Sequence, residues 1–184
     1  MTILLRDSLA RVTAAGNYVN MVDLKSGFNP LFLREEDLRQ GIELLFYAYR
    51  DFTGQPDAIL TELGFGRAHH RTIYFIGRNP GITVSQLLDI LKVSKQSLSR
   101  VLGQLVREGF VDSGAGTRDR RQRMLNLTEK GIALERRLTE NQRSRIARAY
   151  REAGAEAVDG YRKVLLGIID EREREKVLAR LAGD

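Results

Sequence analysis

A cluster of positive charge lies in the middle of the chain. Within six residues the sequence places four arginines and one acid, Arg118, Asp119, Arg120, Arg121 and Arg123. Guanidinium groups bind phosphate through paired hydrogen bonds, so the chemistry that this cluster suits is contact with a phosphate backbone. Gly114-Ala115-Gly116 permits a tight turn just before it, and the strand-like runs 110–111 and 124–127 flank the segment. The sequence therefore predicts a β-hairpin with a cationic tip; a solvated basic loop is the alternative.

Two short helices are predicted directly before this hairpin. Thr83-Val84-Ser85-Gln86 is typical of a capping box, and Ser94 is a candidate N-cap for the second helix. The second helix has an apolar stripe at helical spacing, Leu98, Val101, Leu102 and Leu105. Its remaining early positions are polar and are expected to face outward: Lys95, Gln96, Ser97, Ser99 and Arg100. Such a helix followed by a cationic hairpin indicates DNA binding, in which the helix reads base edges and the hairpin contacts phosphates.

The composition excludes several classes of protein. The 184 residues carry a formal net charge of +6, with 42% hydrophobic and 29% charged residues and no cysteine. Without cysteine there are no disulfides or thiolate metal sites, which fits a reducing compartment. No run approaches the roughly 18 apolar residues of a membrane span, and the N-terminus lacks the pattern of a signal peptide. We therefore expect a cytoplasmic protein with no membrane partner.

Other residues that could do chemistry favour structural roles. His69 and His70 are adjacent, so on a helix they point about 100° apart and cannot chelate one ion together. The acids at 35–37 fall at a predicted helix start, where they offset the helix dipole. Gly64-Phe65-Gly66 lacks the third glycine of a dinucleotide fingerprint. Since phosphate-loop and hydrolase motifs are also absent from the sequence, we expect no enzyme, no catalytic residue, no metal and no cofactor.

Longer helices are predicted before and after the two short helices and the hairpin, and they are expected to form a dimer while the middle of the chain binds DNA. Residues 35–62 space Leu38, Ile42, Leu45, Tyr49 and Phe52 by four and three, as helices that pack along their lengths do; Pro56 and the following glycine turn are expected to close this element. Thr128 is the candidate N-cap of a polar helix over 129–153; Gly154 breaks it, and helical spacing then resumes to about residue 181. We expect a mainly α protein with a small β wing of two to three strands.

The predicted domains are an extension over 1–34, a dimerisation helix over 35–62, a winged helix-turn-helix unit over 63–128 and dimerisation helices over 129–184. We call residues 63–128 the reading unit. Two copies are expected to join through the flanking helices. Their reading helices would then lie about 34 Å apart, one turn of DNA, which demands a near-palindromic site in double-stranded DNA.

Residues 66–131 resemble the MarR family of winged helix-turn-helix regulators. Five stretches carry the resemblance in order and spacing: 81–87, 93–105, 108–111, 119–121 and 125–131. The resemblance implies a triangular homodimer, with the 94–107 helix in the major groove and the 114–123 wing in the adjacent minor groove. It also implies repression or activation of transcription.

Residue roles follow from the same resemblance. Ser99 and Arg100 match the family's polar pair that meets phosphate and base edges. Asp119 and Arg121 match the Asp-x-Arg of its wing, where the aspartate braces an arginine. The residues at 95–97 occupy variable positions and would set sequence preference. Together the expected DNA contacts are Ser94, Lys95, Gln96, Ser97, Ser99, Arg100, Arg118, Asp119, Arg120, Arg121 and Arg123.

A second hypothesis is that a small aromatic or amphipathic effector tunes DNA binding. The family implies a pocket where dimer helices meet the reading unit, and the candidate wall residues are Tyr49, Phe52, His70 and Tyr74; simple packing between helices is the alternative. Two other functions stay open, a winged-helix module that binds protein and a sequence-neutral architectural DNA-binding protein. RNA is disfavoured because its A-form major groove does not admit a helix.

Overall fold

The computed structural model describes residues 33–115 and 123–183. The chain divides into two compact units, residues 1–51 and 52–184. The first unit is described from residue 33 onward, and this described part consists mainly of the first part of one helix. The second unit holds the remaining helices and all the strands that the structure describes.

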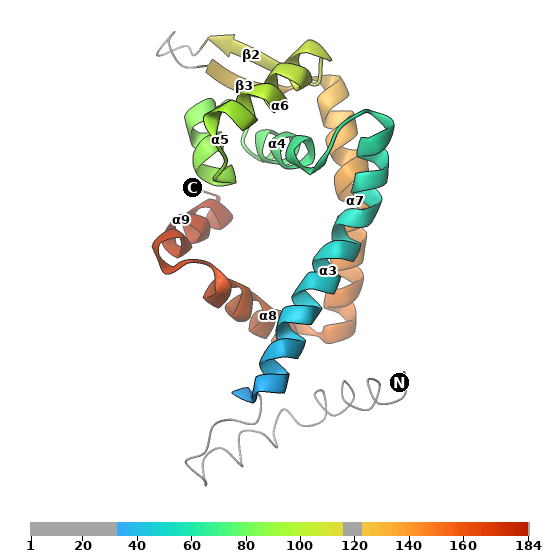
Figure 1. Cartoon of the computed structure of the whole chain (residues 1–184), viewed down its shortest axis with the longest axis vertical. Helices are drawn as coiled ribbons and strands as arrows, with labels where there is room; N and C mark the ends of the chain where they lie inside the picture. Colours follow the sequence, from blue (N-terminus) through green and yellow to red (C-terminus); the bar gives the residue numbers. More distant parts are fainter. Residues whose placement is uncertain (1–32, 116–122, 184) are drawn as a thin grey trace. The chain divides into compact units, whose positions relative to one another are not determined.

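The described elements are almost all helical (Figure 1). In chain order they are α3 (Glu35–Glu62), α4 (Arg67–Arg78), β1 (Ile82–Thr83), α5 (Val84–Leu91), α6 (Lys95–Arg107), β2 (Val111–Ala115), β3 (Arg123–Leu127), α7 (Glu129–Ala153), α8 (Ala155–Ile168) and α9 (Glu171–Ala182). The predicted fold class, mainly α with a small β wing, is confirmed. No helix among the described residues has the length and apolar character needed to cross a membrane.

The three strands form one antiparallel sheet in the order β1-β3-β2. Leu125 in the central strand pairs with Ile82 of β1 on one side and with Ser113 of β2 on the other. Leu125 is 1% exposed, so the centre of the sheet is also part of the core. The short β1 ties the segment before α5 to the hairpin that follows α6.

The core of the second unit joins α4, α5, α6, α7 and the sheet to the end of α3. Its most deeply buried apolar side chains are Leu60, Ile73, Ile76, Leu87, Leu98, Leu105, Leu125 and Leu138. The apolar stripe predicted for 98–105 is confirmed, because all four of its residues are buried. Burying this stripe fixes α6 against α4 and leaves the opposite side of α6 in solvent.

Each helix start predicted from a hydroxyl residue is confirmed. Thr83 Oγ1 accepts the Gln86 N–H, and Gln86 Oε1 accepts the Thr83 N–H over 2.9 Å, which is a complete capping box. Ser94 Oγ accepts the Ser97 N–H, and Thr128 Oγ1 accepts the Gly131 N–H. These contacts satisfy backbone donors that have no partner within their helix. The predicted range of α7 and its end at residue 154 are also confirmed.

The expectation that Pro56 helps to close the first helix is wrong, since α3 continues through Pro56 to Glu62. A proline has no N–H, so the carbonyl of Phe52 loses its donor within the helix. Gln142 of α7 replaces that donor: its Nε2 donates to the Phe52 carbonyl oxygen over 3.2 Å. The Gln142 side chain, which the sequence assigned to a polar helix face, is 8% exposed for this reason.

The C-terminal helical segment is also divided, where the sequence analysis expected one run to about residue 181. Ile169 is extended, and Asp170 starts α9 by accepting the Arg172 N–H over 2.9 Å. Arg174 of α9 then donates to three carbonyl oxygens at the end of α8, those of Leu166, Gly167 and Ile169. One arginine therefore caps α8 and fixes the corner between the two helices.

Candidate nucleic-acid interface

The polar side of α6 is the exposed face of the reading unit. Lys95, Gln96, Ser97, Ser99 and Arg100 are all exposed, whereas Leu98 between them is 2% exposed. Because the buried stripe holds the helix by its other side, these polar side chains are presented together from the first two turns. This is the arrangement that a helix needs to enter a DNA groove with its N-terminal residues.

Two of the serines at this end hold the helix start. Ser94 Oγ accepts the Ser97 N–H over 3.2 Å and donates to Ser97 Oγ over 2.9 Å. Ser94 therefore contributes by capping α6, and its remaining hydrogen-bonding capacity is smaller than that of Ser99. Ser99 and Arg100, one turn further on, are the exposed polar pair that the sequence analysis singled out.

The base of the hairpin lies beside this helix (Figure 1). The β2–β3 register begins at Val111 with Leu127 and extends to Ala115 with Arg123. Arg123 is exposed at the start of β3. The other predicted wing residues, Arg118, Asp119, Arg120 and Arg121, lie outside the described residues. Because these residues follow β2 in the sequence, a cationic tip of the hairpin remains a prediction.

The start of α7 braces the base of the hairpin. Thr128 Oγ1 donates to the Gly109 carbonyl over 2.7 Å. The Lys130 ammonium donates to the Glu108 carbonyl over 2.9 Å and lies 4.1 Å from the centre of the Phe110 ring. Gly131 packs directly on the Phe110 carbonyl, where a Cβ would lie 2.1 Å from the oxygen. The end of α6, the hairpin and α7 are therefore fixed to one another.

A polar chain that the sequence analysis missed connects α4 to α6. His69 Nδ1 accepts the Gly66 N–H over 3.1 Å, and its Nε2 lies 3.0 Å from Gln104 Oε1. Gln104 Nε2 in turn donates to Glu108 over 2.9 Å. Because the Gly66 N–H donates to Nδ1 of His69, Nδ1 carries no proton. Nε2 is then the protonated nitrogen and donates to Gln104 Oε1. These contacts give His69 a structural role between α4 and α6. The described residues contain no cluster able to hold a metal ion.

The candidate effector residues have different surroundings. Within the second unit His70 is buried, and Phe52 and Tyr74 are half-buried. His70 and Tyr74 lie one turn apart on α4, so they share a face of that helix. Tyr49 belongs to the first unit and is 48% exposed. A shared pocket for the four residues remains a prediction.

The burial of His70 predicts a dependence of stability on pH. Burial, which disfavours the imidazolium, lowers the pKa of His70 from its ordinary value of 6.5, although Asp57 and Glu135 oppose the shift. The unfolded chain then binds a proton more readily than the folded chain does. The lowered pKa of His70 therefore makes the stability of the fold depend on pH. Its contribution to the free energy of unfolding is complete above pH 6.5 and is lost as the pH falls below that value.

The measurement is urea unfolding between about pH 7.5 and about pH 5.5, for the wild type and for His70→Gln. The variant should lose less free energy of unfolding over this range than the wild type, because only the wild type has the buried histidine to charge. His69 and all carboxylates are common to both proteins and cancel in the comparison. Equal losses would show that burial of His70 is not coupled to folding.

These features define a winged helix-turn-helix protein: two short helices, the second with an exposed polar face, followed by a β-hairpin that closes on β1. A family model described as MarR family matches residues 63–122. The HTH-type transcriptional regulator PetP of Rhodobacter capsulatus is 56% identical over 140 residues, covering 76% of this chain and 84% of that protein. The chain therefore belongs to the MarR family of transcriptional regulators.

Solved structures agree with this assignment. FabT of Streptococcus pneumoniae in complex with DNA aligns with a TM-score of 0.64 at 22% identity, covering 79% of this chain and 99% of that chain. A mutant of MarR from E. coli in complex with operator DNA gives a TM-score of 0.55 at 20% identity, covering 77% of this chain and 100% of that chain. At these identities the likeness establishes the shared fold.

Proposed function

We propose that this protein is a homodimeric transcriptional regulator that binds a near-palindromic operator in double-stranded DNA. In this proposal α6 enters the major groove and the arginine-rich hairpin contacts the adjacent minor groove. The observation that carries the proposal is the exposed polar face of α6, held by a buried apolar stripe and set beside the base of the hairpin. No catalytic role is proposed for any of these residues.

The residue types on α6 suit readout of base edges. Arginine and lysine pair with guanine, glutamine pairs with adenine, and serine accepts either pattern. On α6, Lys95 and Arg100 could pair with guanine and Gln96 with adenine. Ser97 and Ser99 could bond either base. The arginines of the hairpin suit a narrow minor groove, whose negative potential attracts guanidinium groups. The proposal therefore assigns specificity to α6 and general affinity to the hairpin.

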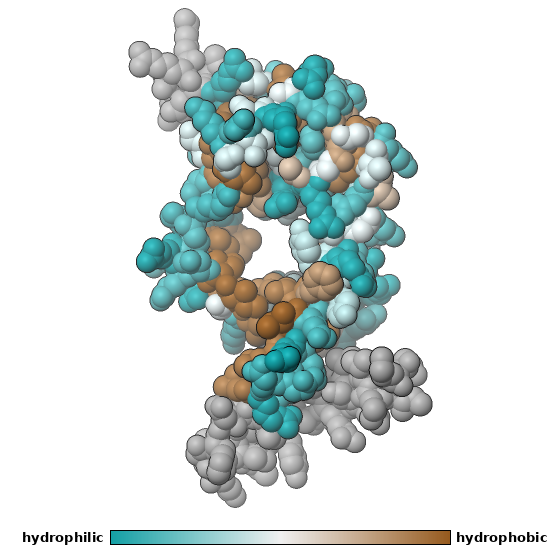
Figure 2. Space-filling view, viewed as in Figure 1, coloured by the Kyte–Doolittle hydropathy of each residue, from teal (hydrophilic) through white to brown (hydrophobic). Residues whose placement is uncertain are grey.

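Exposed apolar side chains support the homodimer. In the first unit Leu38, Ile42, Leu45 and Tyr49 follow the predicted four-three spacing and are each between 47% and 71% exposed. In the second unit Val164 and Ile168 of α8 are both 62% exposed. Figure 2 shows hydrophobic surface over α3 and over α8. Apolar surface of this extent suits burial against a second copy of the chain.

The salt dependence of duplex binding tests the DNA-binding part of the proposal. A protein with six to ten phosphate contacts loses about 10³ to 10⁵ in affinity between about 50 and 200 mM salt. We expect a loss in this range for the wild type. Binding that is indifferent to salt would contradict the assignment of the hairpin to phosphate contacts, and no binding at all would favour the protein-interaction module.

Arg100→Ala tests the division of roles within the interface. If Arg100 contacts a base, the variant should weaken operator binding by about 1–3 kcal/mol and relax preference at one position in each half-site. Arg121→Ala should instead weaken binding to all sequences about equally, because a phosphate contact carries no sequence information. Competition binding against a set of singly substituted operators measures both. A change in one base preference with Arg121→Ala would contradict this division.

We also propose that a small aromatic or amphipathic effector binds near His70, Tyr74 and Phe52. The rings of Phe52 and Tyr74 are half-buried, which leaves a ligand aromatic surface to stack on. The test is a thermal-shift series with small aromatic carboxylates, for the wild type and for Tyr74→Ala. A shift that the variant loses supports the site. Small shifts that are the same in both proteins would leave these rings a packing role only.

A further inference from the structure

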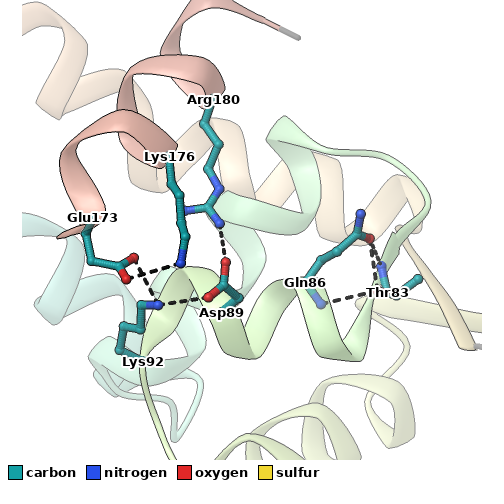
Figure 3. A network of polar contacts seen from close by, with 7 residues as sticks. All are labelled: Thr83, Gln86, Asp89, Lys92, Glu173, Lys176 and Arg180. Carbon is teal, nitrogen blue, oxygen red and sulfur yellow. Dashed lines mark hydrogen bonds and ion pairs between the residues drawn. The ribbon is translucent and has the colours of Figure 1, made fainter.

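Helix α9 contacts helix α5 of the reading unit through charged side chains (Figure 3). We call this set the α5–α9 clasp and define it as Asp89, Lys92, Glu173, Lys176 and Arg180. Lys92 Nζ lies 2.8 Å from Asp89 Oδ1 and 3.0 Å from Glu173 Oε2. The Arg180 guanidinium bonds the second oxygen of Asp89, so two ion pairs cross between the helices. Residues about ninety positions apart in the sequence are thereby joined.

The charges of the clasp are matched to one another. Hydrogen bonds from Lys92 and then Arg180 hold the pKa of Asp89 below its ordinary value. The hydrogen bond from Lys92 likewise lowers the pKa of Glu173, and these two carboxylates raise the pKa of Lys92. Asp89, Glu173 and Lys92 therefore keep their charges at neutral pH.

The contact between α5 and α9 consists of charged side chains and leaves α9 largely exposed to solvent. None of the residues of α9, all of which the structure describes, is buried, and Leu181 is 73% exposed. By contrast Leu87 of α5 is fully buried in the core of the reading unit. Helix α5 is therefore folded into the reading unit without help from α9. The clasp adds an attachment between the reading unit and the C-terminal helices, and breaking it should leave the winged helix intact.

The attachment point is the turn of the helix-turn-helix. At its start α5 is pinned by the capping box of Thr83 and Gln86 (Figure 3). At its end Lys92 adopts a left-handed conformation with φ of 52°, two residues before Ser94 starts α6. On the other side Arg174 fixes α9 to the end of α8. Specific contacts thus connect α8 to α9 and α9 to α5, and the turn at Lys92 joins α5 directly to α6, the recognition helix of the proposed function.

We propose that the α5–α9 clasp holds the reading unit at a set angle to α8 and α9 and thereby fixes the half-site spacing that the dimer accepts. The inference rests on the proposed function, a dimer that binds two half-sites. In such a dimer the distance between the two recognition helices is constant only if each reading unit is held against the helices that join the copies. The clasp residues are positioning residues, because they act through α5 and not by contact with DNA.

The test compares Arg180→Glu with Arg172→Glu. Both variants make the same change of charge on α9, but Arg172 makes no ion pair among the described residues and is exposed. Binding is measured to duplexes whose half-sites are moved apart one base pair at a time, and to a duplex with a single half-site. Hydrogen exchange of α9 reports whether the clasp itself has opened.

For the wild type and Arg172→Glu we expect a preference of about tenfold or more for the best spacing over its neighbours, falling to about twofold in Arg180→Glu. Single half-site affinity and its salt dependence should be equal in all three proteins, and exchange of α9 should accelerate only in Arg180→Glu. The double variant Asp89→Lys with Arg180→Glu restores opposite charges across the helices, so it should recover most of the spacing preference.

Two results would overturn the inference while leaving the proposed function standing. One is unchanged exchange of α9 in Arg180→Glu, which would mean that the clasp does not hold α9. The other is faster exchange with an unchanged spacing preference, which would mean that the clasp has no influence on the operator. A wild type that binds no duplex would contradict the proposed function, and this inference with it.

Discussion

Gly131→Ala is expected to destabilise the protein severely, although alanine is normally the better residue in a helix. Gly131 is the third residue of α7, and a Cβ there would lie 2.1 Å from the carbonyl oxygen of Phe110 and 3.2 Å from Cβ of Leu127. Both neighbours belong to the framework of the hairpin, so relief of the clash requires the backbone to move. We expect a loss of roughly 3 kcal/mol or more in the free energy of unfolding.

The matched control is Gly160→Ala, which makes the same substitution inside α8. Apart from its chain neighbours and the backbone of its own helix, no atom lies within 4 Å of a Cβ at Gly160, so this variant should gain up to about 1 kcal/mol from helix propensity. Urea unfolding followed by circular dichroism measures both variants. If Gly131→Ala were as stable as the wild type, the close packing of α7 on the hairpin would be wrong.

Ile42→Glu is expected to separate the dimer and to abolish tight operator binding. Ile42 is 71% exposed in the middle of the apolar stripe of α3, so the single chain tolerates a charge there. In a dimer the same carboxylate would be buried without a partner, which is strongly unfavourable. Linked half-sites gain about 10² to 10⁴ in apparent affinity, and the monomer should lose that factor.

Gln40→Glu is the control for this variant, since Gln40 is exposed and points away from the stripe of Leu38, Ile42 and Leu45 on the same helix. Light scattering gives the mass in solution, and binding to an operator and to a single half-site gives the two affinities. A dimeric Ile42→Glu protein would show that α3 does not form the proposed interface. Circular dichroism of the variant distinguishes loss of the dimer from loss of the fold.

The reading unit could be predicted because its information is local. A capping residue and the amide three positions later, as in Thr83 and Gln86, start a helix through contacts within one turn. The stripe from Leu98 to Leu105 sets the buried side of α6 by spacing alone. Its exposed side, from Lys95 to Arg100, follows from the same periodicity. The hydroxyl of Thr128 likewise marks the start of α7.

The errors arise where distant residues override a local rule. Pro56 indicates a helix end unless another group replaces the missing donor to the Phe52 carbonyl, and that donor is Gln142, 90 positions from Phe52. The chain from His69 to Gln104 and the clasp between Asp89 and Arg180 have no sequence pattern for the same reason. The start of α9 is different, because Asp170 with Glu173 has the spacing of a capping box and could have been found.

Selection of bound duplexes from a random pool determines whether a dimer of this chain reads a near-palindromic DNA sequence. The selection is made at about 150 mM salt, where nonspecific phosphate contacts are weakened, and the mass of the bound protein is measured in parallel. We expect an enriched near-palindrome with half-sites about one helical turn apart, bound by two copies of the chain. Salt-sensitive binding without any enriched sequence would contradict sequence-specific binding and favour a sequence-neutral architectural role.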